Sequence, residues 1–341
     1  MRIIVDILHP AHSHFFRNFI KEMKKKGHEI LITARKKDVA LELLREDGFD
    51  FKVISELKKG GLGLLKEFVS RTYKLYKIAR RFKPDVLVGV MGPSITVVGK
   101  LLGIPAIVFY NNENAKMTNF FAYPLANAVC TSSSYCAKVN GRHITYPGYH
   151  ELAYLHPKRF KPNKETLKKL RISAGEKYIL VRFVSFQASH DVGEKGLSNK
   201  RKVVEVLGRY GRVYITSETG LPEDLKRYVL RIKDKKDIFD VINYATLVFG
   251  EGATIASEAA MLGVPAVFVN SLQLGYLKEL EKDYGLVYNF KRQEPGLQKA
   301  VELLESKKLK EKHQKAREKM LRGKIDVTEW MVEFVEKKKW K

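Results

Sequence analysis

The sequence predicts an α/β protein with two Rossmann-like domains in tandem, each built on a doubly wound parallel sheet. Three observations lead to this prediction. Short apolar runs, rich in β-branched residues, alternate along the chain with longer amphipathic segments. This alternation is interrupted once, at residues 146–163, where proline, aromatic and polar residues predominate and indicate an interdomain linker. The length of 341 residues is sufficient for two domains that each have a hydrophobic core.

The first series of elements occupies residues 1–150. Each expected strand is short and apolar, which is typical of strands buried on both faces of a parallel sheet. The expected strands are RIIVDIL, HEILITAR, FKVIS, PDVLVGV, IPAIVFY and AVCTSS. The helices expected between them are HFFRNFIKEMKKKG, VALELLREDG, a long basic helix at about residues 64–82, SITVVGKLLG and a short helix near residues 118–127.

The second series begins after the linker and has the same character. Its expected strands are KYILVRFV, RVYITS, TLVFG and AVFVN. Its expected helices are NKRKVVEVLGRYG, a helix around EDLKRYVLRI, and TIASEAAML. The run 297–341 is heavily charged and is also expected to be helical.

Composition narrows the class of protein. Apolar residues make up 45% of the chain and aromatic residues 11%, which describes a globular protein rather than a disordered one. No apolar run reaches about 18 residues, so we expect no transmembrane helix. The N-terminal stretch MRIIVDILHPAHSH is typical of a first strand rather than a signal peptide. Cys130 and Cys136 are too few to cross-link such a chain and lack zinc-site spacing, so we expect a cytoplasmic protein.

The net charge of +25 indicates a partner that carries phosphates. Nucleic acid, anionic lipid headgroups and phosphorylated substrates all fit this sign. The sequence has no zinc-finger spacing, no RNP-like aromatic motif and no obvious helix-turn-helix, so we expect no specific nucleic-acid recognition. The enrichment in lysine and glutamate is typical of thermophile surfaces, and it accounts for the density of charges but not for their sign.

The stretch GEGATIASEAAMLGVPAVFVN, residues 250–270, combines a strand end, a turn of small residues and a helix start. This geometry presents backbone N–H groups to a phosphate. We expect Thr254 to cap the helix, and Glu258, one turn later on the same face, to reach a ribose hydroxyl. The alternative is an ordinary strand–turn–helix connection with a solvated glutamate.

Three histidines follow the first strand in the stretch HPAHSHF. A histidine at this position can act as a general base at neutral pH. The alternative is that the rings cap the following helix or form hydrogen bonds within the loop. A metal site is less favoured than catalysis, because no carboxylate cluster lies close by in the sequence. The first half also lacks a G-x-G-x-x-G motif, and no P-loop occurs, which argues against a dehydrogenase and a P-loop NTPase.

Four stretches together resemble motifs of the GT-B nucleotide-sugar enzymes. They are HPAHSHF, KPDVLVGVMGPSITVVGKLLGIPAIVFYNN, MTNFFAYPLANAV and DIFDVINYATLVFGEGATIASEAAMLGVPAVFVN. The chain is most similar to the inverting glycosyltransferases that include the lipid-linked N-acetylglucosaminyltransferase of peptidoglycan synthesis, and uncharacterized archaeal proteins of this general type exist. His14 matches the terminal histidine of the family's first loop, and Thr118 and Asn119 are in register with its second signature.

The resemblance implies a GT-B fold, in which two Rossmann-like domains face a central cleft. Residues 1–150 would form the acceptor domain, and residues 151–325 would form the domain that binds the nucleotide-sugar donor. Residues 326–341 would form a C-terminal helix that packs back on the N-terminal domain.

The implied activity is an inverting displacement on a nucleotide-diphosphate sugar, with UDP favoured and with no metal or cofactor. His14, or His12 if the register differs, would deprotonate the acceptor hydroxyl, and Glu113 is a further candidate for acid–base chemistry. The candidates for binding the nucleotide sugar are Arg182, His190, Gly252, Ala253, Thr254, Glu258 and Gln273. The candidates on the acceptor side are His9, Asn112 and Asn119.

The chain departs from the family pattern in two places. Its first loop has Pro10, Ala11 and Ser13 where the family has glycines. After VFVN it offers only Gln273 and Glu279 where the family usually has an acidic residue and glutamines, so the donor sugar stays open. For Arg182 the alternative is a surface or ion-pair position, and for His190 it is a local helix cap.

Two other functions remain open. A UDP-N-acetylglucosamine 2-epimerase shares the fold, but the aspartate that such an enzyme needs would fall near Pro93, where no carboxylate exists; Glu113 is the nearest substitute. A protein that binds the nucleotide sugar without chemistry is the third possibility, and dispensable His12 and His14 with an essential Glu258 would favour it.

The acceptor is suggested by residues 60–84, which mix leucines and aromatic residues with many lysines and arginines. A basic amphipathic helix of this kind can lie on an anionic membrane. A lipid-linked or cell-envelope glycan at the inner face of the membrane would then be the acceptor. The alternative is a helix that packs on the core and leaves a solvated basic face.

Overall fold

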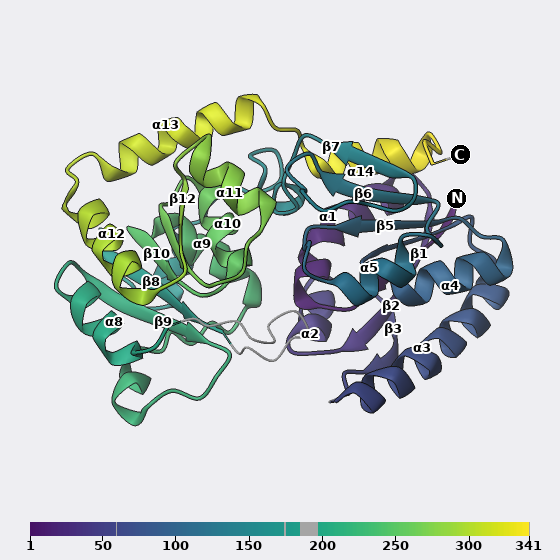
Figure 1. Ribbon diagram of the computed structural model, residues 1–341, viewed down its shortest axis with the longest axis horizontal. Coiled ribbons are helices and arrows are strands. Elements are labelled where there is room, and N and C mark those ends of the chain that lie inside the picture. Colours follow the sequence, from purple (N-terminus) through teal and green to yellow (C-terminus); the bar gives the residue numbers. More distant parts are fainter. Residues whose placement is uncertain (59, 174, 185–196, 341) are drawn as a thin grey trace. The chain divides into compact units, whose positions relative to one another are not determined.

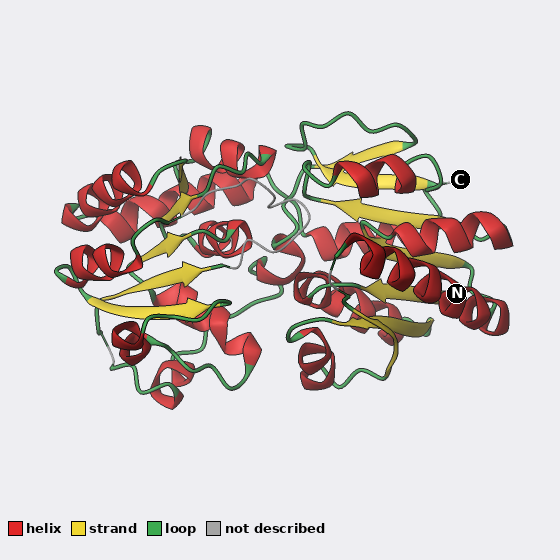
Figure 2. Cartoon of the chain, turned by 60° about the horizontal axis from the view of Figure 1, so that its bottom comes forward, coloured by secondary structure: helices red, strands yellow, loops and turns green. Residues whose placement is uncertain are grey.

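The computed structural model describes residues 1–58, 60–173, 175–184 and 197–340. The chain forms two compact units. One comprises Met1–Tyr154 together with Ile325–Lys341, and the other comprises Leu155–Lys324. Each unit is a parallel sheet with helices on both sides (Figure 1, Figure 2), so the predicted pair of doubly wound α/β domains is confirmed.

The first unit is built on a seven-stranded parallel sheet with the strand order β3-β2-β1-β4-β5-β6-β7. Its strands are β1 (Arg2–Ile7), β2 (Glu29–Lys36), β3 (Phe51–Glu56), β4 (Val86–Val90), β5 (Ala106–Tyr110), β6 (Ala128–Ser132) and β7 (His143–Tyr146). The order reverses between β1 and β4, and in this fold class ligands bind at the carboxyl ends of the strands that flank such a switch point.

Seven helices are described in this unit. They are α1 (Pro10–Lys25), α2 (Ala40–Glu46), α3 (Gly61–Phe82), α4 (Pro93–Leu102), α5 (Lys116–Ala122), α6 (Leu152–Leu155, which spans the unit boundary) and α14 (Val327–Glu336). Glu336 at the end of α14 pairs with His28 at 2.9 Å and with Lys26 at 2.5 Å, just after α1. The C-terminal segment is therefore part of the first unit.

The second unit is built on a five-stranded sheet with the order β12-β11-β10-β8-β9. Its strands are β8 (Tyr178–Phe183), β9 (Arg212–Ser217), β10 (Leu247–Gly250), β11 (Ala266–Val269) and β12 (Val287–Phe290). Its helices are α7 (Glu165–Lys169), α8 (Lys200–Gly208), α9 (Ile238–Tyr244), α10 (Ala253–Leu262), α11 (Gly275–Lys282), α12 (Gln293–Glu305) and α13 (Leu309–Arg322), with short 3₁₀ helices at Glu223–Tyr228 and Lys235–Asp237.

The structure corrects two predicted elements and adds two strands that the sequence analysis missed. The helix expected around EDLKRYVLRI is only a 3₁₀ helix, Glu223–Tyr228, because Val229 turns to extended backbone and bridges Ile215 at the edge of the sheet. The linker expected at 146–163 includes the end of β7 and helix α6. Strands β7 and β12 were missed, since both are four-residue edge strands with partly exposed side chains.

Charged residues attach α3 to the sheet of the first unit. Asp6 at the end of β1 is fully buried, accepts a 2.5 Å hydrogen bond from the Thr33 hydroxyl and pairs with the buried Arg71 of α3. Glu67 of α3 receives two hydrogen bonds from the Arg35 guanidinium, at 2.6 and 2.8 Å. The inner face of α3 is therefore largely ionic at its N-terminal half, where it covers the polar ends of β1 and β2.

Strands β8 and β10 approach closely at Gly250 in the second unit. A Cβ at this position would lie 2.3 Å from the carbonyl oxygen of Arg182 and 2.9 Å from its nitrogen. These are backbone atoms of a paired strand, so they cannot move aside without breaking the ladder. Only glycine fits where β10 ends.

We predict that Gly250→Ala destabilises the protein by roughly 2 kcal/mol or more, because the added methyl group overlaps the backbone of Arg182. Gly208→Ala is the matched control, since it lies exposed at the end of α8 with no atom near its Cβ position. The control should be neutral or stabilise by up to about 1 kcal/mol. Urea unfolding of the two variants measures the difference, and equal stabilities would contradict this account of Gly250.

His150 is a buried imidazole in the first unit. Its ring stacks on Phe15 at a centroid distance of 4.2 Å. Burial lowers its pKa to about 3, against a smaller opposing effect of a backbone hydrogen bond with Tyr110. Because the unfolded chain binds a proton at this histidine near its ordinary pKa and the folded chain does not, acid favours unfolding.

We predict that wild-type stability falls as the pH drops below about 6.5, and that His150 accounts for about 2 kcal/mol of the loss between about pH 7.5 and about pH 5. His150→Leu should lose correspondingly less over this window, whatever its stability at neutral pH. Urea unfolding at several pH values measures the two profiles, and parallel profiles would count against a neutral buried His150.

Candidate functional site

The turn Gly250–Gly252 lies at the carboxyl end of the sheet of the second unit. Helix α10 begins directly after it, with Gly252 in the N-cap position and no capping hydrogen bond from a side chain. The predicted cap at Thr254 is therefore wrong, because Thr254 is already the second helical residue and its side chain is exposed. The first turn of α10 is left with backbone N–H groups that no cap side chain satisfies, which is the arrangement that binds anions.

Glu251 organises this turn and was missed by the sequence analysis. Its side chain is buried and accepts hydrogen bonds from the N–H groups of Val184 at 3.1 Å and Leu197 at 2.7 Å. Its backbone N–H donates to Arg182 and its carbonyl accepts from the Asn270 amide, both at 3.1 Å. Burial raises the pKa of the Glu251 carboxyl, and the two backbone donors oppose this effect. The available signal was a glutamate between two glycines at the end of a buried strand.

Arg182 lies beside the same turn. A Cβ on Gly252 would lie 3.4 Å from the Cγ atom of Arg182, so the arginine side chain passes against the start of α10. Its guanidinium forms an ion pair with Glu218, which follows β9. The ion pair that the sequence analysis left open for Arg182 is thus present, while the aliphatic part of the same side chain lies against the start of α10.

The other residues predicted to bind the nucleotide sugar lie on α10 and in the connection between β11 and α11. Ala253 and Thr254 form the first turn of α10, and Glu258 is buried one turn later with 6% of its surface exposed. Gln273 is exposed between β11 and α11. His190 lies outside the described residues. Glu279, the other polar candidate after β11, forms an ion pair with Lys324.

The three histidines of the stretch HPAHSHF lie at the start of α1. His9 is the N-cap residue, and its Nδ1 accepts a 3.2 Å hydrogen bond from Ala11 N–H, so this ring caps the helix as one alternative predicted. His12 is buried; its Nδ1 accepts from Leu8 N–H at 3.3 Å, and its ring lies 5.8 Å from that of His9. Burial, followed by the nearby His9, His150, Lys37 and Arg35, lowers the pKa of His12 well below its ordinary value.

His14 lies in a different environment from His12. Its Nδ1 is 2.8 Å from a guanidinium nitrogen of Arg17, and its ring lies 5.4 Å from that of Tyr154. Arg17 in turn pairs with Asp47 at 3.3 Å, and both of these side chains are largely buried. The carboxylate therefore anchors the arginine that contacts His14.

The remaining predicted residues of the first unit follow β5. The side chain of Asn112 accepts a hydrogen bond from Asn114 N–H at 2.9 Å and forms the turn. Glu113 Oε1 lies 3.6 Å from Cys136 Sγ, in the loop after β6. Asn119 on α5 is buried, and its Oδ1 has no hydrogen-bond partner within the described part of the chain. Such a buried acceptor is the kind of group that a bound molecule satisfies.

Neither unit shows a metal site in its described residues. Across residues 1–58, 60–173, 175–184 and 197–340, no group of three or more histidine, cysteine, aspartate or glutamate side chains is placed to hold a metal ion.

Comparison with known proteins identifies relatives over most of the chain. An uncharacterized protein of Methanocaldococcus jannaschii is 26% identical over 275 residues, which is 77% of this chain and 80% of that protein. The UDP-N-acetylglucosamine–N-acetylmuramyl-(pentapeptide) pyrophosphoryl-undecaprenol N-acetylglucosamine transferase of Actinobacillus pleuropneumoniae is 24% identical over 262 residues, 73% of this chain and 72% of the transferase.

This chain is similar to the crystal structure of UDP-GlcNAc 2-epimerase from Neisseria meningitidis bound to UDP-GlcNAc, with a TM-score of 0.73 and 12% sequence identity. The match covers 99% of this chain and 100% of the epimerase chain. At this identity the similarity establishes the fold, which is GT-B, and the predicted resemblance to GT-B nucleotide-sugar enzymes is confirmed. A family model described as "Protein of unknown function (DUF354)" matches residues 1–338, and the chain therefore belongs to the DUF354 family.

Proposed function

We propose that this protein is a glycosyltransferase that moves a sugar from a nucleotide-diphosphate sugar, with UDP as the favoured nucleotide, to an acceptor hydroxyl. The observation that carries the proposal is the Gly250–Gly252 turn, where the N-terminus of α10 has no side-chain cap and the side chain of Arg182 lies against it. The relatives support the same class, since one is an N-acetylglucosamine transferase and one structural neighbour holds UDP-GlcNAc.

In this proposal the diphosphate binds to the backbone N–H groups of Ala253 and Thr254. Negative charge grows on the diphosphate as it leaves, and the helix dipole and the guanidinium of Arg182 are fixed beside it, so they stabilise the transition state more than the ground state. The ribose hydroxyls donate to Glu258. Because that carboxylate is buried, its hydrogen bonds to the ribose are stronger than they would be in water.

The proposed reaction is a single displacement with inversion. The acceptor oxygen forms a bond to the anomeric carbon, while the bond from that carbon to the diphosphate oxygen breaks and the nucleoside diphosphate leaves with the electron pair. The acceptor proton passes to a base of the first unit, for which His12, His14 and Glu113 are the candidates. Charge stabilisation by backbone amides and arginine requires no metal or cofactor in this scheme.

An epimerase is the second candidate, because the Neisseria meningitidis 2-epimerase shares the fold over nearly the whole chain. Pro93, at the start of α4, stands where the sequence resemblance would put an epimerase aspartate. Incubation with UDP-GlcNAc in D₂O without an acceptor separates the two reactions. An epimerase would incorporate deuterium at the sugar C2, whereas a transferase leaves that carbon unlabelled.

We predict that UDP or a UDP-sugar at a hundred times its dissociation constant stabilises the wild-type protein by about 2.7 kcal/mol. Glu258→Gln should weaken this binding by roughly tenfold or more, because it removes the charge that accepts the ribose hydrogen bonds. Glu294→Gln is the matched control, since Glu294 is exposed at the start of α12 and pairs with Lys202.

Thermal unfolding with UDP-, GDP-, CDP- and dTDP-sugars measures these effects. A response to one nucleotide class in wild type and control, but not in Glu258→Gln, supports the donor site. Stabilisation by DNA or RNA in place of any nucleotide sugar would contradict the proposed function.

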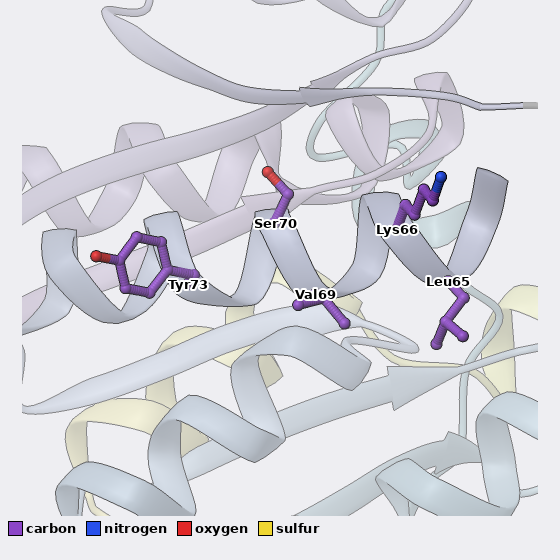
Figure 3. Close-up of a pocket in the computed structure, with 5 residues that line it drawn as sticks. All are labelled: Leu65, Lys66, Val69, Ser70 and Tyr73. Carbon is purple, nitrogen blue, oxygen red and sulfur yellow. The ribbon is translucent and has the colours of Figure 1, made fainter. Parts of the chain in front are cut away.

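For the acceptor, we propose a lipid-linked glycan reached at an anionic membrane surface through α3. Leu62, Leu65, Val69 and Tyr73 form a stripe on α3 whose side chains are between 58% and 77% exposed. Leu65 and Val69 project from one side of the helix, and Lys66 projects from the opposite side (Figure 3). Further along α3 the exposed basic residues are Lys74, Lys77, Arg80 and Arg81.

An apolar stripe next to lysines and arginines on a chain of net charge +25 matches the headgroup and acyl regions of an anionic bilayer. A second copy of the chain carries the same net charge of +25, so electrostatic repulsion disfavours it as the partner of this stripe. In the described part of the chain, no helix combines the length and the apolar character that crossing a bilayer requires.

We predict that the protein binds vesicles containing phosphatidylglycerol, that binding weakens with salt, and that Leu65→Gln together with Val69→Gln weakens it roughly tenfold or more. Leu101→Gln on α4 is the control, because Leu101 is 66% exposed but lies on a different helix. Vesicle sedimentation measures the binding, and equal binding by both variants would argue against α3 as the contact.

A further inference from the structure

The first turn of α8 carries three consecutive basic residues, Lys200, Arg201 and Lys202, and no acidic one. The start of a helix is its positive end, where acidic residues are stabilising and basic residues are not. Arg201 is neutralised by Asp224 at 2.8 Å, and Lys202 is neutralised by Glu294 at 2.9 Å. Lys200, in contrast, forms no ion pair with a carboxylate in the part of the chain that the structure describes. A charge that breaks a local rule without compensation is expected at a functional site.

Neutral groups hold the ammonium of Lys200 in place. Its Nζ donates a 3.0 Å hydrogen bond to the hydroxyl of Thr219, just after β9. It also lies 5.0 Å from the ring centroid of Phe183, the last residue of β8. A hydroxyl and an aromatic ring fix the position of this charge without cancelling it. Because an ammonium has three N–H donors, Lys200 can offer the other two to a ligand.

Two buried side chains fix the backbone that leads into α8. Glu251 accepts a hydrogen bond from Leu197 N–H at 2.7 Å, and Gln293 accepts one from Asn199 N–H at 2.8 Å. The side chain of Asn199 caps α8 by accepting a backbone N–H of its first turn at 3.0 Å. This cap occupies the end of the helix, so α8 offers a ligand the side chain of Lys200 rather than its backbone.

The ammonium of Lys200 also lies near the start of α10. Burial raises the pKa of the Glu251 carboxyl, whereas the two backbone donors and the positive charge of Lys200 lower it. The ammonium is therefore close enough to act on the residue that precedes the N-cap of α10. The turn that holds Lys200 through Thr219 also carries Glu218, which pairs with Arg182. Arg182 thus shares its charge with a carboxylate, whereas Lys200 does not.

We propose that Lys200 binds the phosphate to which the sugar of the donor is attached, and that it thereby selects nucleoside diphosphate donors over monophosphate donors. This inference rests on the proposed function, in which the first turn of α10 binds the diphosphate. Negative charge grows on the sugar-bearing phosphate as its bond to the sugar breaks, so an unpaired ammonium fixed beside it stabilises the transition state. A donor with a single phosphate would occupy α10 and leave Lys200 without a partner.

Binding of UDP, UMP and uridine to the wild type and to Lys200→Met tests the proposal. Methionine keeps an unbranched stem over Phe183 and removes the charge with its donors. We expect the variant to weaken UDP binding by roughly tenfold or more and to change UMP and uridine binding by at most about twofold. Isothermal titration calorimetry measures the dissociation constants. Losses of equal size for UDP and UMP, or unchanged UDP binding, would overturn the proposal.

The matched control is Lys202→Met, which removes the same charge from the same turn of α8. Because Lys202 pairs with Glu294 at the surface, the control should change the binding of all three ligands by at most about twofold. A loss of UDP binding in the control as large as in Lys200→Met would overturn a specific role for Lys200.

A second variant leaves the lysine in place. Thr219→Val has nearly the same shape but lacks the hydroxyl that holds the ammonium, so it should weaken UDP binding by roughly threefold or more and leave UMP binding unchanged. Unchanged UDP binding in this variant would contradict the account of how Lys200 is held.

Inorganic pyrophosphate separates this inference from the proposed function. If no nucleotide sugar binds, while pyrophosphate binds the wild type and Lys202→Met roughly tenfold more tightly than Lys200→Met, the proposed function fails and Lys200 still binds a diphosphate. If nucleotide sugars bind, and Lys200→Met binds UDP as tightly as the wild type does, the proposed function stands and the role of Lys200 fails. If neither pyrophosphate nor any nucleotide binds the wild type, both fail.

Discussion

The buried carboxylate of Glu251 is the interaction on which the edge of the second unit depends. It holds the N–H groups of Val184 and Leu197, while its own backbone joins Arg182 to Asn270. An unsatisfied buried amide costs about 1–3 kcal/mol, so no apolar residue could replace it. Three strand ends are thereby brought to one turn, and the close approach of β8 and β10 at Gly250 depends on that turn.

The open end of α10 follows from this arrangement. A side chain at the N-cap would satisfy the first N–H groups of the helix, and Gly252 has none. Glu251 is adjacent to the helix start but directs both carboxylate oxygens to backbone groups of other segments. The helix start thus has no side-chain cap although a carboxylate lies next to it, and the side chain of Arg182 passes against the same turn.

The first unit uses buried charge in a different way. Asp6 and Glu67 bind arginines on α3 and β2, and these pairs lie where the sheet ends in polar groups. The N-terminal half of α3 therefore turns Glu67 and Arg71 inward and leaves leucines exposed. The same sheet end carries Leu8, whose N–H donates a hydrogen bond to Nδ1 of His12.

Much of this fold could be predicted from the sequence, because buried parallel strands are apolar runs that need no partner to be recognised. The short edge strands β7 and β12 lack that signal. The helix around EDLKRYVLRI was predicted from its periodicity, but the bridge of Val229 to Ile215 overrides it. Thr254 was preferred as a cap on residue type alone, although the glycine two positions earlier takes that place.

The site was predicted only in outline. The turn at 250–252 and the histidines after β1 stand out by composition, whereas the position of Glu251 between two glycines does not reveal which groups its carboxylate holds until its burial is known. His14 contacts Arg17, and Arg17 pairs with Asp47, which is 33 positions away from His14 in the sequence and has to be brought in by the fold. The exposed face of α3 was predicted only as one of two alternatives, because leucines in an amphipathic pattern also indicate packing on the core.

The central claim is that the α10 turn binds the diphosphate of a nucleotide, and a crystal structure of the protein with UDP tests it most directly. We expect phosphate oxygens within hydrogen-bonding distance of the N–H groups of Ala253 and Thr254 and of the Arg182 guanidinium, with the ribose at Glu258. UDP bound away from this turn, or with its ribose and phosphates directed elsewhere, would contradict the account.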